Sequence, residues 1–136
     1  MKILLIDGQG GKMGKELAEG IIKTFPEVEL VAVGTNSTAT VSMIKGGAKD
    51  AATGENAVVV GCRTADIIVG PIGIVIADSL LGEITPKMAV AVGQSPATKI
   101  LIPSVRCNNL VAGVKAASMT ELMEDVLAKI ARCMKE

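Results

Sequence analysis

The chain has 136 residues, of which 49% are hydrophobic, and its 14 basic residues balance its 14 acidic ones. This size predicts one folded domain over residues 1–136, and the apolar content excludes disorder as its main state. The charge balance gives no broad basic surface for nucleic acid, and Phe25 as the sole aromatic residue leaves no stacking platform for single strands. The absence of histidine removes the commonest general base and metal ligand, so we expect no metal site and leave catalysis open.

Cysteines and apolar segments bear on location and assembly. Cys62, Cys107 and Cys133 form neither an even set nor a CxxC pair, which predicts reduced thiols and a cytoplasmic protein. The longest apolar stretch, 67–77, is too short and too interrupted by glycine and proline to cross a bilayer, so no membrane partner is expected. So much apolar surface in a small domain leads us to expect a homodimer or larger homo-oligomer.

The first half of the chain alternates strand and helix patterns. Lys2–Asp7 is a short apolar run ending in glycines, which is typical of a buried parallel strand. A helix that Pro26 ends is then predicted by apolar residues four apart: Met13, Leu17, Ile21 and Phe25. The further elements expected here are a strand, a helix capped by Ser37 or Thr38, a short strand and a short helix: Val28–Val33, Ser37–Gly47, Lys49–Thr53 and Glu55–Arg63.

The second half continues this alternation. A strand, two helices, a strand and a sixth strand are expected in turn: Asp66–Val69, Ile74–Leu81, Pro86–Val92, Lys99–Pro103 and Leu110–Val114. Thr85 is the expected N-cap of the Pro86 helix. Ser118 and Glu121 form a capping box before a last amphipathic helix. The whole pattern predicts an α/β fold, a single Rossmann-like domain with a doubly wound, mainly parallel sheet and helices on both faces.

A glycine-rich turn follows the first strand and opens the first helix. Its residues fit the spacing G-x-x-G-x-x-G with one additional glycine: Gly8, Gln9, Gly10, Gly11, Lys12, Met13 and Gly14. In such turns one glycine permits the tight bend, another a close approach to phosphate, and a third close helix–strand packing. Lys12 and Lys15 oppose the helix dipole unless an anion is bound, although both are also consistent with simple solvent exposure. The turn therefore predicts a small phosphate-bearing ligand.

This turn resembles the G-x-x-G-[RK]-M-G turn in the nucleotide-binding domain of dihydrodipicolinate reductase. The likeness covers only the first strand, turn and helix, and it implies a similar phosphate turn. This chain lacks the histidine that the enzyme's substrate domain uses, so the reaction is not implied.

A wider resemblance spans nearly the whole chain. It is to a bacterial family of short Rossmann-like proteins of unknown function, and it rests on six runs: Ile6–Gly11, Val33–Ser37, Ala52–Asn56, Gly70–Ile74, Gly82–Pro86 and Cys107–Asn109. This resemblance implies a bacterial origin and one compact domain, but no activity.

The sequence departs from a dinucleotide site after the second strand. An NAD site would place an acid there to hold the ribose, and this chain has Thr35, Asn36 and Ser37 after Gly34. Hydroxyl and amide groups suit a 2′-phosphate weakly, which favours NADP slightly over NAD, with another nucleotide left open. Asp7 would repel a pyrophosphate; we favour a role capping its own turn over holding Mg²⁺ through water or acting as a base.

Parallel-sheet geometry gathers ligand-binding loops beyond the carboxyl ends of the strands. It is expected to bring the glycine turn and 34–37 together with a second glycine-containing turn and with residues 104–109. The second turn comprises Gly70, Pro71, Ile72 and Gly73. Arg106 is a candidate anion clamp, and Cys107 beside it lacks a base partner. Arg63 and Thr64 are the other polar candidates, although a surface position is the commoner role for each.

Three functions remain open from the sequence. The first is a module that binds a nucleotide or similar phosphate-bearing metabolite. The second is a small oxidoreductase or transferase with its active site shared across a subunit interface. The third is an interaction protein that keeps the fold without the ligand. Fold analogy alone does not choose among them.

Overall fold

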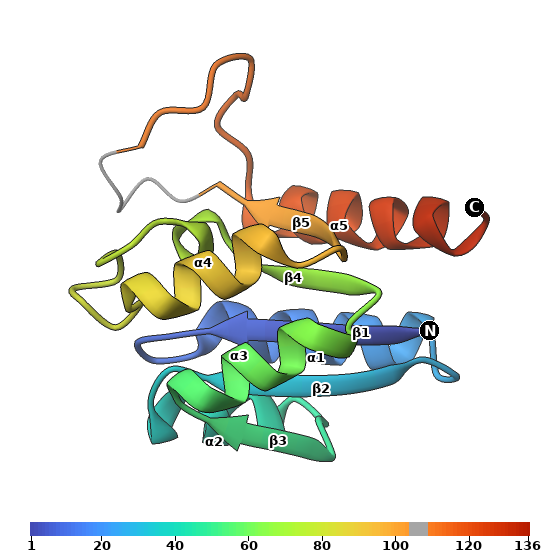
Figure 1. Cartoon of the computed structure of the whole chain (residues 1–136). Coiled ribbons are helices and arrows are strands. Elements are labelled where there is room, and N and C mark those ends of the chain that lie inside the picture. The colour runs from blue at the N-terminus through green and yellow to red at the C-terminus, as the bar shows by residue number, and fades with distance from the viewer. Residues whose placement is uncertain (104–108) are drawn as a thin grey trace.

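The structure is a computed structural model that describes residues 1–103 and 109–136 (Figure 1). In these residues, five strands alternate with five helices and one 3₁₀ turn. In chain order these are β1 (Lys2–Asp7), α1 (Lys12–Thr24), β2 (Glu29–Gly34), α2 (Ser37–Lys45), β3 (Asp50–Thr53), α3 (Glu55–Thr64), β4 (Ile67–Pro71), the 3₁₀ turn η1 (Ile72–Val75), α4 (Pro86–Gln94), β5 (Thr98–Ile102) and α5 (Met119–Met134). No helix in the described ranges is both long and apolar enough to span a membrane.

The five strands form one parallel sheet in the order β3-β2-β1-β4-β5. Asp7 at the end of β1 pairs with Gly34 at the end of β2, and Leu5 pairs with Val69 of β4 on the other side. The strand order therefore reverses between β1 and β4, and in open α/β sheets the crevice at such a point is where ligands bind. The predicted fold class, a Rossmann-like α/β domain with a parallel sheet, is confirmed.

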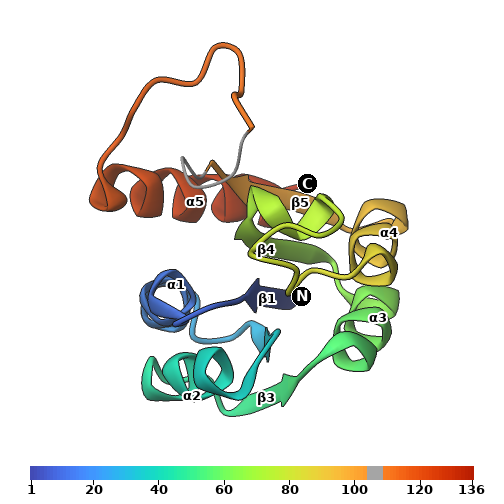
Figure 2. The same cartoon turned by 90° about the vertical axis from the view of Figure 1, so that its left-hand side faces the viewer.

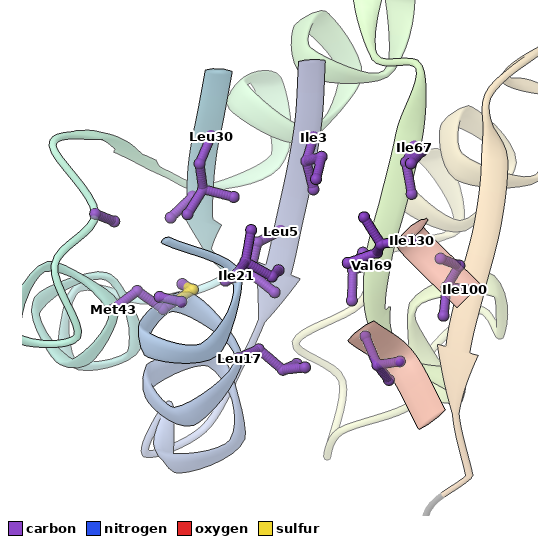
Figure 3. Packing of buried hydrophobic residues seen from close by; sticks show 14 of the residues in the cluster. Ile3, Leu5, Leu17, Ile21, Leu30, Met43, Ile67, Val69, Ile100 and Ile130 are labelled. Carbon is purple, nitrogen blue, oxygen red and sulfur yellow. The ribbon is translucent and has the colours of Figure 1, made fainter. Parts of the chain in front are cut away.

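Alternate residues of β1 face two separate hydrophobic clusters. Ile3 and Leu5 belong to a cluster that α1, α2 and α5 cover, whereas Leu4 and Ile6 belong to one beneath α3 and α4. Figure 2 shows the helices on the two faces of the sheet, and Figure 3 shows the first cluster, where Ile130 of α5 packs near β4 and β5. Because both faces are covered, β4 and the interior of β1 are buried and do not alternate with polar residues.

Most predicted elements form at or near the expected bounds. The N-cap Thr85 with Pro86 in the first turn begins α4 as predicted, and Ser118 with Glu121 makes the predicted capping box of α5. The run Glu55–Arg63 is helical as predicted, because a parallel β3 and β4 need a crossover between them. The predicted caps of α2, Ser37 and Thr38, are wrong. The N-cap is Asn36, whose side chain accepts the N–H of Ala39.

Two predicted elements are absent from the described structure. The predicted helix Ile74–Leu81 is instead η1 followed by an irregular stretch, because three non-glycine residues there have left-handed backbones that no helix accommodates: Asp78 (φ 66°), Leu80 (φ 55°) and Leu81 (φ 56°). We call residues 76–85 the crossover segment. The predicted strand Leu110–Val114 is also wrong, since this run pairs with none of the strands in residues 1–103 and 109–136, and Leu110 is fully exposed.

Candidate functional site at the glycine turn

The glycine turn connects β1 to α1 at the carboxyl edge of the sheet. Gly11 N–H donates to the carbonyl of Gly8 at 3.0 Å, which closes the turn, and Gly11 has a left-handed φ of 73°. As a glycine, Gly11 has no side chain to cap α1, although it occupies the N-cap position. The helix therefore begins with N–H groups that need acceptors from elsewhere.

Two of the glycines make room for neighbouring elements. A Cβ on Gly11 would lie 2.7 Å from the Cα of Ala39, the backbone of α2. A Cβ on Gly14 would lie 2.8 Å from both the Cβ of Asp7 and the Cγ of Met43. Gly14 thus allows the close helix–strand packing expected of the third glycine, and Gly11 allows close packing between α1 and α2.

The other two glycines differ sharply in the space around them. A Cβ on Gly8 would lie 2.7 Å from Thr35 Oγ1, 2.9 Å from Leu80 Cδ1 and 3.1 Å from Glu83 Oε1. A Cβ on Gly10 would meet nothing within 4 Å. Gly10, the additional glycine outside the G-x-x-G-x-x-G spacing, is therefore the one with open space around it.

Asp7 supplies some of the hydrogen-bond acceptors that the turn and the start of α1 need. Its buried carboxylate accepts the N–H of Gly8 at 2.8 Å and, through its other oxygen, the N–H of Gly14 at 2.7 Å. Burial raises the pKa of Asp7, while these two N–H groups act to lower it and the nearby Glu83 adds to the rise. These hydrogen bonds correspond to the turn-capping role favoured above.

Glu83 is the residue that sequence reasoning missed. It lies in the crossover segment, and its Oε1 accepts three hydrogen bonds: Gln9 N–H at 2.9 Å, Thr35 Oγ1 at 2.5 Å and Asn36 Nδ2 at 2.8 Å. Burial acts to raise the pKa of Glu83, but these hydrogen bonds together lower it. A carboxylate from a distant segment thus lies beside the end of β2, near where an NAD site places its acid.

An open hollow of about 420 Å³ lies on the other side of the turn. It is lined by the turn, the first residues of α1, Pro71, Leu80 and Met119. Among the described residues, no acceptor takes the N–H groups of Gly10, Lys12 or Met13. The charged residues of this lining are Asp7, Lys12 and Glu16. No group of three or more potential metal ligands occurs in residues 1–103 or 109–136.

The remaining predicted site residues are only partly brought together. Ser37 is exposed at the start of α2, and Ile72 and Gly73 form η1 after β4. Gly70 of β4 allows a close approach to the neighbouring strand β1 and not to a ligand, since a Cβ there would lie 2.5 Å from the carbonyl oxygen of Ile6. Of the second predicted turn, Pro71 lines the hollow.

The arginine candidates lie outside the site or outside the described residues. Arg63 and Thr64 end α3 at the opposite edge of the sheet, where Thr64 accepts a hydrogen bond from Lys2 at the start of β1. Arg106 and Cys107 lie within residues 104–108, which are not described.

The fold and the turn define this chain as a Rossmann-like α/β protein. It belongs to the family described as Domain of unknown function (DUF3842), whose model matches residues 2–135. Among curated proteins, none is similar enough to count as a match. One similar solved structure is a dodecameric FMN-dependent UbiX-like decarboxylase from Escherichia coli O157:H7, 17% identical, with a TM-score of 0.50 over 98% of this chain and 76% of that one. At this identity the likeness shows the fold alone.

Proposed function

We propose that this protein binds a nucleotide or another phosphate-bearing metabolite at the start of α1. The observation that carries the proposal is that the N–H groups of Gly10, Lys12 and Met13 have no acceptor in residues 1–103 or 109–136, and that these residues line an open hollow at the point where strand order reverses. N–H groups at a helix start attract anions, and the partial positive charge of the helix adds to that attraction. The FMN dependence of the similar decarboxylase is consistent with a nucleotide-like ligand.

NADP is not favoured over NAD in this proposal. The expected preference depends on Thr35, Asn36 and Ser37 as partners for a 2′-phosphate. Thr35 and Asn36 donate instead to Glu83, whose negative charge would repel that phosphate.

Calorimetric titration with FMN, AMP, NAD and NADP tests the proposal. We expect at least one of these compounds to bind, and Gly10→Val to weaken its binding by tenfold or more, because the valine would project into the open space at the turn. Gly93→Val in α4 is the matched control: its Cβ also meets nothing within 4 Å, and it lies away from the turn. A ligand at 100 times its dissociation constant should also stabilise the fold by about 2.7 kcal/mol. Equal binding to both variants would contradict the proposal.

A second candidate function, a ligand-free interaction protein, is favoured by a specific observation. The chain's own carboxylates already accept N–H groups of the turn, Asp7 from Gly8 and Gly14, and Glu83 from Gln9. These three N–H groups need no external anion, because internal carboxylates already accept them. Absence of binding by every compound, with the wild-type fold intact by circular dichroism, would favour this candidate.

We also propose a cytoplasmic homo-oligomer. Large apolar side chains are exposed on four helices: Val41 and Ile44 of α2, Val60 of α3, Val90 of α4 and Met119 of α5. The similar decarboxylase is dodecameric, and the unpaired thiols of Cys62 and Cys133 are compatible with a reducing compartment. Light scattering after size-exclusion chromatography tests the assembly, and a monomer at micromolar concentration would contradict it.

A further inference from the structure

The two sides of the glycine turn offer a ligand different amounts of room. A dinucleotide in a Rossmann fold places its phosphates at the helix start and its adenosine ribose beside the end of β2. Here Thr35 and Asn36 follow the end of β2. The Glu83 carboxylate accepts hydrogen bonds from their side chains and from Gln9 N–H. The hydrogen-bond donors available to a ribose or a 2′-phosphate on this side are therefore already used.

The position of Glu83 is fixed by the crossover segment on which it lies. The next residue, Ile84, is buried with 1% of its surface exposed, and its carbonyl accepts the N–H of Asp78 at 2.7 Å. Ser79 Oγ donates to the carbonyl of Gly73 at 2.5 Å. Leu80 lies over Gly8, close enough that a Cβ on that glycine would be 2.9 Å from its Cδ1. The segment is thus held by its own hydrogen bond, by a hydrogen bond to η1 and by the contact of Leu80 with the turn, and Glu83 is not a loosely placed surface side chain.

The hollow on the β4 side has a different character. Its walls include the apolar side chains of Met13, Pro71, Leu80 and Met119. Gly10, Lys12 and Met13, whose N–H groups have no acceptor among the described residues, all line this hollow. The ligand chemistry that fits is one terminal phosphate joined to an apolar or flat organic group.

We infer that Glu83 is a specificity-determining residue that closes the β2 side of the turn, so that the site takes a phosphate monoester of mononucleotide type and rejects dinucleotides. This inference rests on the proposed function, because it names the class of ligand for the same site. Its carboxylate excludes the second nucleoside by occupying the donors of Gln9, Thr35 and Asn36, and its charge adds discrimination against NADP.

Comparison of wild type with Glu83→Ala and Glu83→Gln by calorimetry tests the inference. For wild type we expect FMN or AMP to bind at least tenfold more tightly than NAD and NADP. Glu83→Ala removes the carboxylate, so NAD binding should strengthen at least tenfold while mononucleotide binding changes less than threefold. Glu83→Gln keeps an oxygen acceptor for the three donors, so it should continue to exclude NAD. Circular dichroism of each variant checks that the fold is kept.

Amide NMR spectra give a second readout that does not depend on a variant. Titration of wild type with FMN or AMP should shift the amide signals of Gly10, Lys12 and Met13, and leave those of Thr35 and Asn36, which do not line the hollow, nearly unchanged. Equal affinity for NAD and FMN, or NAD binding that weakens in Glu83→Ala because the carboxylate holds a ribose, would overturn the inference and leave the proposed function standing. No binding of any compound to wild type or Glu83→Ala would overturn both.

Discussion

The two sides of the glycine turn share one backbone but have opposite environments. On the β2 side, Glu83 lies beside Gly8 and takes up the nearby donors of Gln9, Thr35 and Asn36. On the β4 side, Gly10 is open and the first N–H groups of α1 have no acceptor in the described chain. A glycine-rich turn is thus not a uniform anion site, because packed neighbours decide which of its N–H groups remain available. The following changes test this comparison.

The largest effect is expected from Gly11→Val. A side chain there combines a left-handed backbone with overlap on the α2 backbone, 2.7 Å from the Cα of Ala39. We expect the free energy of unfolding to fall by about 3 kcal/mol or more. Gly10→Val, one residue earlier, should change it by no more than about 0.5 kcal/mol, because its surroundings are open. Urea unfolding followed by far-ultraviolet circular dichroism measures both, since the chain has no Trp or Tyr. Similar losses in the two variants would contradict the assigned roles of these glycines.

Asp7→Ala should have the next largest effect. It leaves the N–H groups of Gly8 and Gly14 without an acceptor, which should lower the free energy of unfolding by about 2 kcal/mol. Because the folded pKa of Asp7 is raised, its stabilising contribution is full below about pH 4 and declines as pH rises through the folded value. The difference between wild type and Asp7→Ala in urea unfolding should therefore be larger at acid pH than at pH 7. A difference that grows with pH would contradict this sign.

Glu83→Ala should cost about 1–2 kcal/mol at neutral pH, through loss of its charge-assisted hydrogen bonds. The pH dependence runs opposite to that of Asp7. The lowered folded pKa of Glu83 means that its contribution is present above about pH 4.3 and is lost as pH falls through the folded value. Thermal unfolding at a series of pH values should show the wild-type advantage over Glu83→Ala disappearing in acid. A constant advantage would show that packing, and not the carboxylate charge, holds the crossover segment.

The smallest effect is expected from Leu81→Gly. Leu81 is 96% exposed and has a left-handed φ of 56°, so glycine relieves backbone strain and loses little packing. Relief of about 1–2 kcal/mol is partly offset by the greater freedom of glycine in the unfolded chain, for a net gain of about 0.5 kcal/mol. Chemical unfolding would detect it. Leu80→Gly, in the same backbone region, is the matched comparison and should lose stability because Leu80 packs on Gly8. A gain in both would mean that Leu80 contributes no useful packing.

Local patterns in the sequence predicted most of the fold. The apolar run Lys2–Asp7, the capped helix at Pro86 and the box formed by Ser118 and Glu121 each depend on neighbouring residues. The parallel direction of the strands follows from the alternation of strands and helices. The crossover segment was mispredicted because its backbone turns left-handed at residues with no special preference for that region, such as Leu80 and Leu81.

Of the candidate site, the glycine turn was predictable from the sequence and Glu83 was not. The glycine turn is contiguous in sequence, whereas Glu83 contacts Thr35 across 48 positions. One signal was available: the absence of an acid after the second strand leaves room for one from another element. Nothing local identifies Glu83 as that acid, since its placement depends on how the crossover segment folds back onto the turn.

The position of α5 has a consequence for the making of the protein in the cell. Its residues Val126 and Ile130 complete the hydrophobic cluster beside Ile100 and Ile102 of β5, yet they are translated well after that strand. At about 5–20 residues per second, the ribosome needs a few seconds to proceed from β5 to the end of α5. Throughout that interval the nascent sheet exposes apolar side chains that its own final helix has yet to cover. This is when the chain is most prone to associate with other nascent chains or to need a chaperone.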